Sequence, residues 1–103
     1  MTSSDMVIRD EVLEVLKNFE DPELGIDIYT LGLIYKVDFD ESIQKLALKM
    51  TFTTPLCPYG PQMVKDLTGR FTALGLRTED IAINVVFDPP WEPSDEVREM
   101  LGV

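Results

Sequence analysis

The residues best suited to chemistry in this chain lie in two short segments. The first, TFTTPLCPYG, contains the only cysteine, Cys57, which follows Thr53 and Thr54. The second, DPEL, places Asp21 and Glu23 on either side of a proline. A thiolate can act as a nucleophile or a metal ligand, hydroxyl groups can donate hydrogen bonds to it, and carboxylates can bind metals or exchange protons. We therefore take these five residues as the candidate functional residues.

Two interpretations of Cys57 are open from its position. It follows a predicted strand and comes directly before a predicted helix, with Pro58 in the favoured first helical position. The free N–H groups and partial positive charge at a helix start lower the pKa of a thiol placed there. A lone cysteine in a folded protein is, however, commonly a small buried apolar residue. The sequence pattern does not decide between a displayed thiol and a packed one.

The two carboxylates of DPEL also have a structural and a functional interpretation. Asp21 can cap a turn or a short helix that begins at Pro22, and Glu23 then complements the helix dipole. Alternatively, the two side chains flank a metal or act as acid and base. Their negative field would raise the pKa of a nearby thiol, which opposes the effect of a helix start.

Length and composition narrow the class of protein. A chain of 103 residues that is 45% hydrophobic predicts one compact domain over residues 1–103. Nine basic residues against 19 acidic ones give a net charge of −10, so we expect neither nucleic acid nor an anionic membrane surface as a partner. We see no secretory signal and no membrane span, and a single cysteine fits the reducing cytoplasm.

Hydrophobic periodicity places the candidate residues at the ends of predicted elements. Spacings of three and four residues predict helices, and alternation predicts strands. The predicted elements are a helix over 4–19 capped by Ser4, a hairpin of strands 33–39 and 45–52, a helix over about 58–74, a strand over 81–87 and a short C-terminal helix. This α-β-β-α-β-α order indicates an α+β fold, a two-layer α/β sandwich with a small mixed three-stranded sheet and helices packed on one face. The strand order is not given by the pattern.

A permanent metal centre within one chain is not expected. Histidine is absent, and one thiolate with carboxylates is a poor match for zinc or an iron–sulfur cluster, which take three or four sulfur or nitrogen ligands. We therefore predict no permanently bound cofactor. A transient iron–sulfur cluster or iron ion at Cys57 would share its ligands with a client protein, a small thiol or a second chain, so a homodimer is one possibility.

Three segments, DPELGIDIYTLGLIY, TFTTPLCP and VVFDPPW, occur in this order between about residue 8 and the C-terminus. Together they resemble the SufT/PaaD-type family of small metal–sulfur cluster assembly factors, long catalogued as a domain of unknown function. The resemblance implies a single α/β domain that takes part in iron–sulfur protein maturation at a late delivery or targeting step. No cysteine-rich tail follows the matched region, so we expect a minimal, stand-alone form.

The resemblance also implies which residues form the site. The family's D-P-E motif falls on residues 21–23, and its T-x-x-x-C motif falls on Thr53 and Cys57, with Thr54 beside them. In the family these residues are thought to converge into one pocket.

The leading hypothesis is a cytoplasmic, non-catalytic factor in iron–sulfur cluster assembly or in delivery to client proteins. Its partners would be iron–sulfur client or assembly proteins. Cys57 would be a transient sulfur ligand or client contact, Asp21 and Glu23 would tune or complete the site, and the threonines would orient it. One alternative is a thiol-dependent enzyme with Cys57 as nucleophile and Glu23 as base. Another is a protein-interaction adaptor in which the cysteine is packing.

Overall fold

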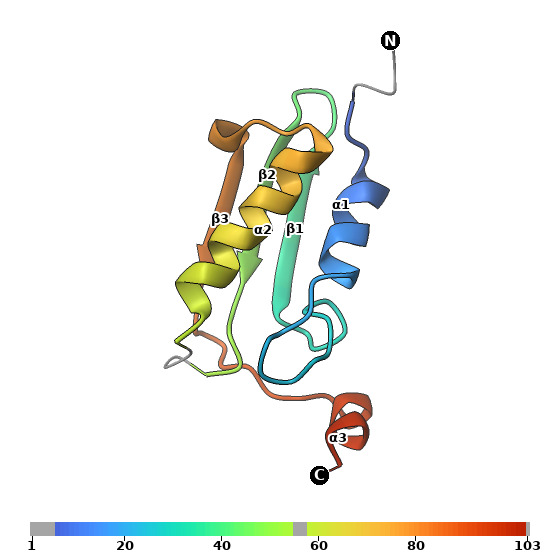
Figure 1. The fold of residues 1–103 in the computed structure, drawn as a ribbon, viewed down its shortest axis with the longest axis vertical. Helices are drawn as coiled ribbons and strands as arrows, with labels where there is room; N and C mark the ends of the chain where they lie inside the picture. The colour runs from blue at the N-terminus through green and yellow to red at the C-terminus, as the bar shows by residue number, and fades with distance from the viewer. Residues whose placement is uncertain (1–5, 55–57, 103) are drawn as a thin grey trace.

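The computed structural model describes residues 6–54 and 58–102 as an α+β fold (Figure 1). Its elements are α1 (Arg9–Lys17), β1 (Ile34–Asp40), β2 (Lys45–Met50), α2 (Gly60–Leu74), the 3-10 turn η2 (Thr78–Asp80), β3 (Ile81–Val85) and α3 (Asp95–Leu101). The predicted fold class and element order are therefore confirmed. Within the described ranges, no helix is both long and apolar enough to cross a membrane.

The three strands form one mixed sheet in the order β1-β2-β3. β1 and β2 are antiparallel neighbours joined by a tight turn, with an irregularity between Ile34 and Lys36. β2 and β3 are parallel with a regular register from Leu46–Ile81 to Met50–Val85. A parallel neighbour needs a long crossover, and α2 provides it.

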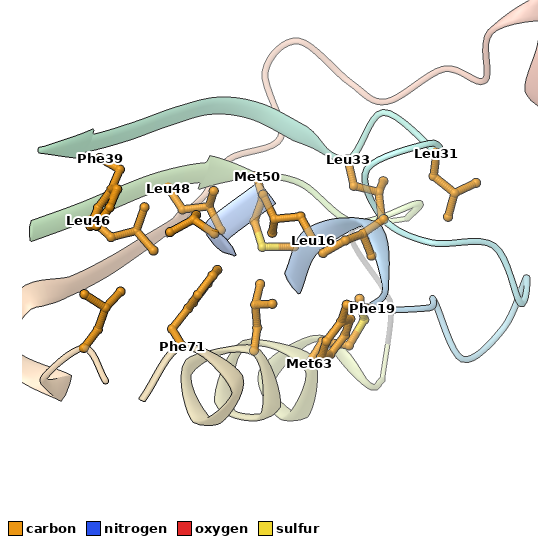
Figure 2. Close-up of a cluster of buried hydrophobic side chains, with 14 of the residues drawn as sticks. Leu16, Phe19, Leu31, Leu33, Phe39, Leu46, Leu48, Met50, Met63 and Phe71 are labelled. Atoms are coloured by element: carbon orange, nitrogen blue, oxygen red, sulfur yellow. The ribbon is translucent and has the colours of Figure 1, made fainter. Parts of the chain in front are cut away.

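The core lies between one face of the sheet and helices α1 and α2. Alternate residues of β2 are buried, and Figure 2 shows these side chains pointing toward α2, from which Phe71 and Met63 point back at them. α1 lies alongside β1, and α3 lies beyond the end of the sheet (Figure 1). The largest fully buried side chains are Phe71, Leu16, Ile28, Leu31, Leu33, Leu46, Leu48, Met50, Leu67, Val7, Val12 and Val97.

The first helix is shorter at its N-terminus than the sequence predicts. α1 begins at Arg9, and the Ile8 N–H donates to Glu11 Oε1 at 3.0 Å. An acidic side chain in the first turn therefore replaces the predicted cap, and Ser4 lies outside the described residues.

The second helix also begins later than predicted. Tyr59 is its N-cap, since the Tyr59 carbonyl accepts the first helical hydrogen bond, from the Met63 N–H at 2.8 Å. Gly60 opens the helix and Pro61 follows, so the prediction of Pro58 as the first helical residue is wrong. Cys57 is thus two residues before the N-cap instead of directly at the helix start, and it lies outside the described residues.

The strands β2 and β3 end two residues earlier than predicted, so Phe52 and Phe87 lie beyond the ends of the ladders. Phe52 and Phe87 pack against each other edge to face, with ring centroids 6.1 Å apart. This contact joins the chain that leaves β2 to the chain that leaves β3.

Candidate functional site

Three segments that carry the candidate motifs meet at one end of the sheet (Figure 1): the loop between α1 and β1, the chain after β2 and the chain after β3. The Thr51 N–H donates to the Leu33 carbonyl at 2.8 Å, and the Trp91 Nε1–H donates to the Leu31 carbonyl at 2.6 Å. These hydrogen bonds tie the segments that follow β2 and β3 to the loop that contains DPEL.

Asp21 holds the DPEL turn together from the inside. Its side chain is buried, with 1% of the residue exposed, and Oδ1 accepts hydrogen bonds from the N–H groups of Glu23 at 2.8 Å and Leu24 at 3.1 Å. Gly25 closes the turn through its N–H to the Asp21 carbonyl at 2.8 Å and adopts a φ of 69°. The predicted turn-capping role of Asp21 is therefore confirmed.

Glu23 points out of the same turn and is exposed. The DPEL turn thus separates its two carboxylates by environment: one is buried and fixed by backbone N–H groups, and the other faces solvent. A buried, hydrogen-bonded carboxylate acts mainly on the shape of the loop, whereas an exposed one can bind a cation or a partner.

Thr53 and Thr54 lie in the bend that follows β2, and both are half-buried. The residue before them, Phe52, is packed against the start of α2, where a Cβ added to Gly60 would overlap its ring, with 2.9 Å to Cζ. The absence of a side chain at Gly60 therefore lets the helix approach the bend closely. The structure brings the threonine bend and the DPEL turn to the same end of the sheet, and a single pocket with Cys57 stays a prediction.

The DPPW segment braces this end of the sheet. Besides the indole hydrogen bond of Trp91, the Tyr35 hydroxyl donates to the Pro89 carbonyl at 2.8 Å. Gly32, with a φ of 80°, lies beside the indole, and its absent Cβ would be 3.9 Å from Nε1. Trp91 is half-buried and packs against the core, so its indole hydrogen bond anchors the loop between α1 and β1 that contains DPEL.

A hollow of about 630 Å³ lies between the DPEL turn and α2, and sequence reasoning did not identify it. Pro22 lines one side, Tyr59 lines the end near the helix start, and the Arg70 guanidinium lies 5.1 Å above the Phe19 ring. A polar strip of α2 at four-residue spacing, Gln62, Asp66 and Arg70, forms the opposite wall. This strip was the available signal, but exposed polar spacing is the normal pattern of a solvated helix face.

Metal-binding side chains do not gather in the described ranges. Over residues 6–54 and 58–102, no group of three His, Cys, Asp or Glu side chains could hold a metal ion.

Both the sequence and the fold of this chain have counterparts among known proteins. Residues 9–84 match the family model described as "Iron-sulfur cluster assembly protein", and the chain belongs to this family. The resemblance seen in the sequence is thereby confirmed.

Individual relatives agree with this assignment. The chain is 41% identical over 71 residues to the Fe-S protein maturation auxiliary factor SufT of Staphylococcus aureus (strain USA300), covering 69% of this chain and 78% of that protein. It is 34% identical over 84 residues to the Fe-S protein maturation auxiliary factor YitW of Bacillus subtilis (strain 168), covering 82% and 80%. Among solved structures, it is similar to the conserved hypothetical protein TM0487 from Thermotoga maritima, with a TM-score of 0.77, 36% identity and coverage of 97% and 99%.

Proposed function

We propose that this protein is a non-catalytic factor in iron–sulfur cluster assembly or in delivery to client proteins, working in the reducing cytoplasm. Its working pocket is formed by Asp21, Glu23, Thr53, Thr54 and Cys57. The observation that carries the proposal is the meeting of the motif-bearing segments at one end of the sheet. The family assignment and the names of the relatives support the same role.

Each residue of the pocket has a role that follows from its surroundings. Asp21 keeps the DPEL turn in shape through its two backbone hydrogen bonds, and the turn presents Glu23 to solvent. Cys57 supplies the sulfur that contacts iron or a cluster, and the hydroxyls of Thr53 and Thr54 orient the bound group.

Iron or a cluster is the cargo of this protein in our proposal. One thiolate per chain leaves most positions on an iron–sulfur cluster to other ligands. A client protein that contributes its own cysteines would complete the set and then keep the cluster, since its ligands outnumber the single one here. Transfer toward the client therefore follows from the shortage of ligands.

The net charge of this chain indicates which kind of partner surface can bind to it. A net charge of −10 repels another acidic surface and attracts a basic one. We therefore expect clients or assembly proteins to approach through basic faces, with association that weakens as salt is added.

Anaerobic reconstitution with iron and sulfide tests the proposal. The wild type is compared with Cys57→Ser and with the double variant Cys57→Ser, Ser42→Cys. The double variant keeps one thiol per chain but moves it to the exposed turn between β1 and β2, away from the site. We expect absorbance and iron content to rise only for the wild type. Equal loading of the relocated thiol would show non-specific thiol chemistry and contradict a built site.

A further inference from the structure

A groove with basic and aromatic walls lies along the edge of β1, where α1 runs beside the strand (Figure 1). Its volume is about 380 Å³. Four consecutive residues of β1, 34–37, form one wall, so the groove follows the edge of the strand, because successive side chains point to opposite faces of a sheet. Arg9 and Leu13 of α1 form the other wall, and Tyr29 of the loop between α1 and β1 completes the lining.

The groove is positively charged although the chain as a whole is strongly acidic. The chain has 19 acidic and nine basic residues, yet the described residues that line the groove include Arg9 and Lys36 and no carboxylate. Lys17 adds a third cation, because its Nζ lies 5.2 Å from the centroid of the Tyr29 ring. None of these three cations forms an ion pair with another described residue.

A pair of like charges at the rim of the groove also indicates an anionic occupant. Lys36 lies directly opposite Lys49 in the register of β1 and β2, and both side chains are exposed. Like charges at directly opposed positions of neighbouring strands destabilise a sheet. A carboxylate bound beside Lys36 offsets this repulsion, so an anionic ligand gains from an arrangement that is unfavourable in the free protein.

The carboxylates on the surrounding elements face other surfaces or are held by the backbone. Those of α1 line a separate hollow on the α2 side of the helix, and Glu20 lines the hollow between the DPEL turn and α2. Glu41 Oε2 accepts the Arg9 N–H at 2.9 Å, and Asp27 Oδ2 accepts a backbone N–H of its own turn at 2.8 Å. Asp38 lies on the open face of the sheet together with the two opposed lysines. Glu41, Asp27 and Asp38 are fewer than the four cations, so the groove and its rim keep a positive excess.

The floor of the groove suits an apolar side chain. Leu13, Ile34 and Val37 are half-buried, pack against the core and line the groove with their remaining surface. The Tyr35 ring also lines the groove and is fixed by its hydroxyl, which donates to the Pro89 carbonyl at 2.8 Å. These walls favour a ligand with a large apolar group, because an ionic ligand alone would leave the apolar surface uncovered.

We propose that this groove binds an acidic segment of a partner protein, one that carries a large apolar side chain between its carboxylates. The apolar side chain packs against Leu13 and Val37, and the carboxylates pair with Arg9 on α1 and with Lys36 on β1. This surface is separate from the candidate site, and binding to it does not depend on the proposed function.

A short segment fits this groove better than an extended polyanion. Nucleic acid and anionic membranes present charge over areas larger than the groove, and the rest of this chain repels them through its excess of acidic residues. A segment of a few residues contacts the basic groove alone. Opposite charges then hold the complex, which weakens as salt is added.

Selection from a library of random short peptides displayed on phage tests the chemistry of the occupant. Peptides that bind the wild type but not Lys36→Glu are retained, and we expect them to combine several carboxylates with Trp, Phe or Leu. The affinity of an enriched peptide, made synthetically, is then measured by fluorescence anisotropy. We expect Arg9→Glu to weaken binding about tenfold. Lys65→Glu is the control with the same change of charge, because Lys65 on α2 lines the hollow near the DPEL turn and not the groove.

The stability of Lys36→Glu separates loss of binding from loss of the fold. The substitution places a carboxylate opposite Lys49, so the thermal unfolding midpoint should be no lower than that of the wild type. Failure to enrich peptides, enrichment of peptides without carboxylates, an equal loss of affinity in Lys65→Glu, a lowered midpoint in Lys36→Glu, or tighter binding of an oligonucleotide or an anionic vesicle to the same residues would overturn the proposal.

Discussion

The buried carboxylate of Asp21 allows a test that separates two contributions to the DPEL turn, the hydrogen-bond acceptor and the negative charge of this side chain. Asp21→Ala removes the acceptor for the N–H groups of Glu23 and Leu24, bonds of 2.8 and 3.1 Å in a residue that is 1% exposed. Loss of a capping side chain costs about 0.5–2 kcal/mol, a figure that includes the N–H groups left without a partner. Because Asp21 accepts from two N–H groups, we expect a loss at the upper end of this range, with the free energy of unfolding lowered by about 2 kcal/mol.

Asp21→Asn keeps the Oδ1 acceptor and removes only the negative charge. It should retain most of the stability, within about 1 kcal/mol of the wild type. For a domain of this size, about 1 kcal/mol corresponds to a shift of about 4–8 °C in Tm, so thermal unfolding followed by circular dichroism resolves the two variants.

Glu23→Gln serves as the matched control for this pair, because it changes an exposed carboxylate in the same turn. We expect its unfolding free energy to stay within about 0.5 kcal/mol of the wild type. Equal losses in Asp21→Ala and Asp21→Asn would show that charge, not the acceptor, stabilises the turn. An unchanged Asp21→Ala variant would refute the reasoning altogether.

Three further variants test two contacts near the candidate site, at Gly60 and Trp91, and the carboxylate of Asp40, which lies away from it. Gly60→Ala should destabilise the fold by about 1–3 kcal/mol in urea unfolding, because its Cβ overlaps the Phe52 ring; an unchanged midpoint would mean that the ring moves freely. Trp91→Phe keeps an aromatic ring but loses the indole hydrogen bond, which should cost about 1 kcal/mol by the same measurement, and no loss would argue against a bracing role. The hydrogen bonds that Ser42 donates, from its hydroxyl first and then its N–H, hold the pKa of Asp40 below its ordinary value. The ionised Asp40 carboxylate stabilises the fold at pH values above the ordinary pKa of an aspartate, and this contribution is lost as the pH falls through the lowered pKa of Asp40. Ser42→Ala should therefore raise the pH midpoint of Asp40 in an NMR titration. An unmoved midpoint would contradict the cause given.

The elements of this fold are readable from the sequence where one face of an element is buried. The alternation of Leu46, Leu48 and Met50 identified β2. The predicted short C-terminal helix is α3, where the Val97 N–H donates to Ser94 Oγ at 3.2 Å. Such patterns record burial along a single element, so they give its type and approximate extent.

The boundaries near the site were harder to predict because tertiary contacts set them. Pro58 fits a first helical position locally, yet α2 begins at Gly60, where the close approach to Phe52 requires glycine. The strand order and the hollow beside Arg70 likewise depend on how distant segments pack. Asp21 was predicted as a turn cap because that bond is local, with its partners only two and three residues away.

The most direct test of the proposed role measures iron–sulfur enzymes in a host whose own relative of this protein has been deleted. The deleted strain is supplied with the wild type or with Cys57→Ser at matched protein levels, and the activity of an iron–sulfur dehydratase is compared with that of an enzyme without a cluster. We predict that the wild type restores the dehydratase and that Cys57→Ser leaves it near the level of the deletion, with the cluster-free enzyme unchanged. Full restoration by Cys57→Ser would contradict the central claim that this thiol handles the cargo.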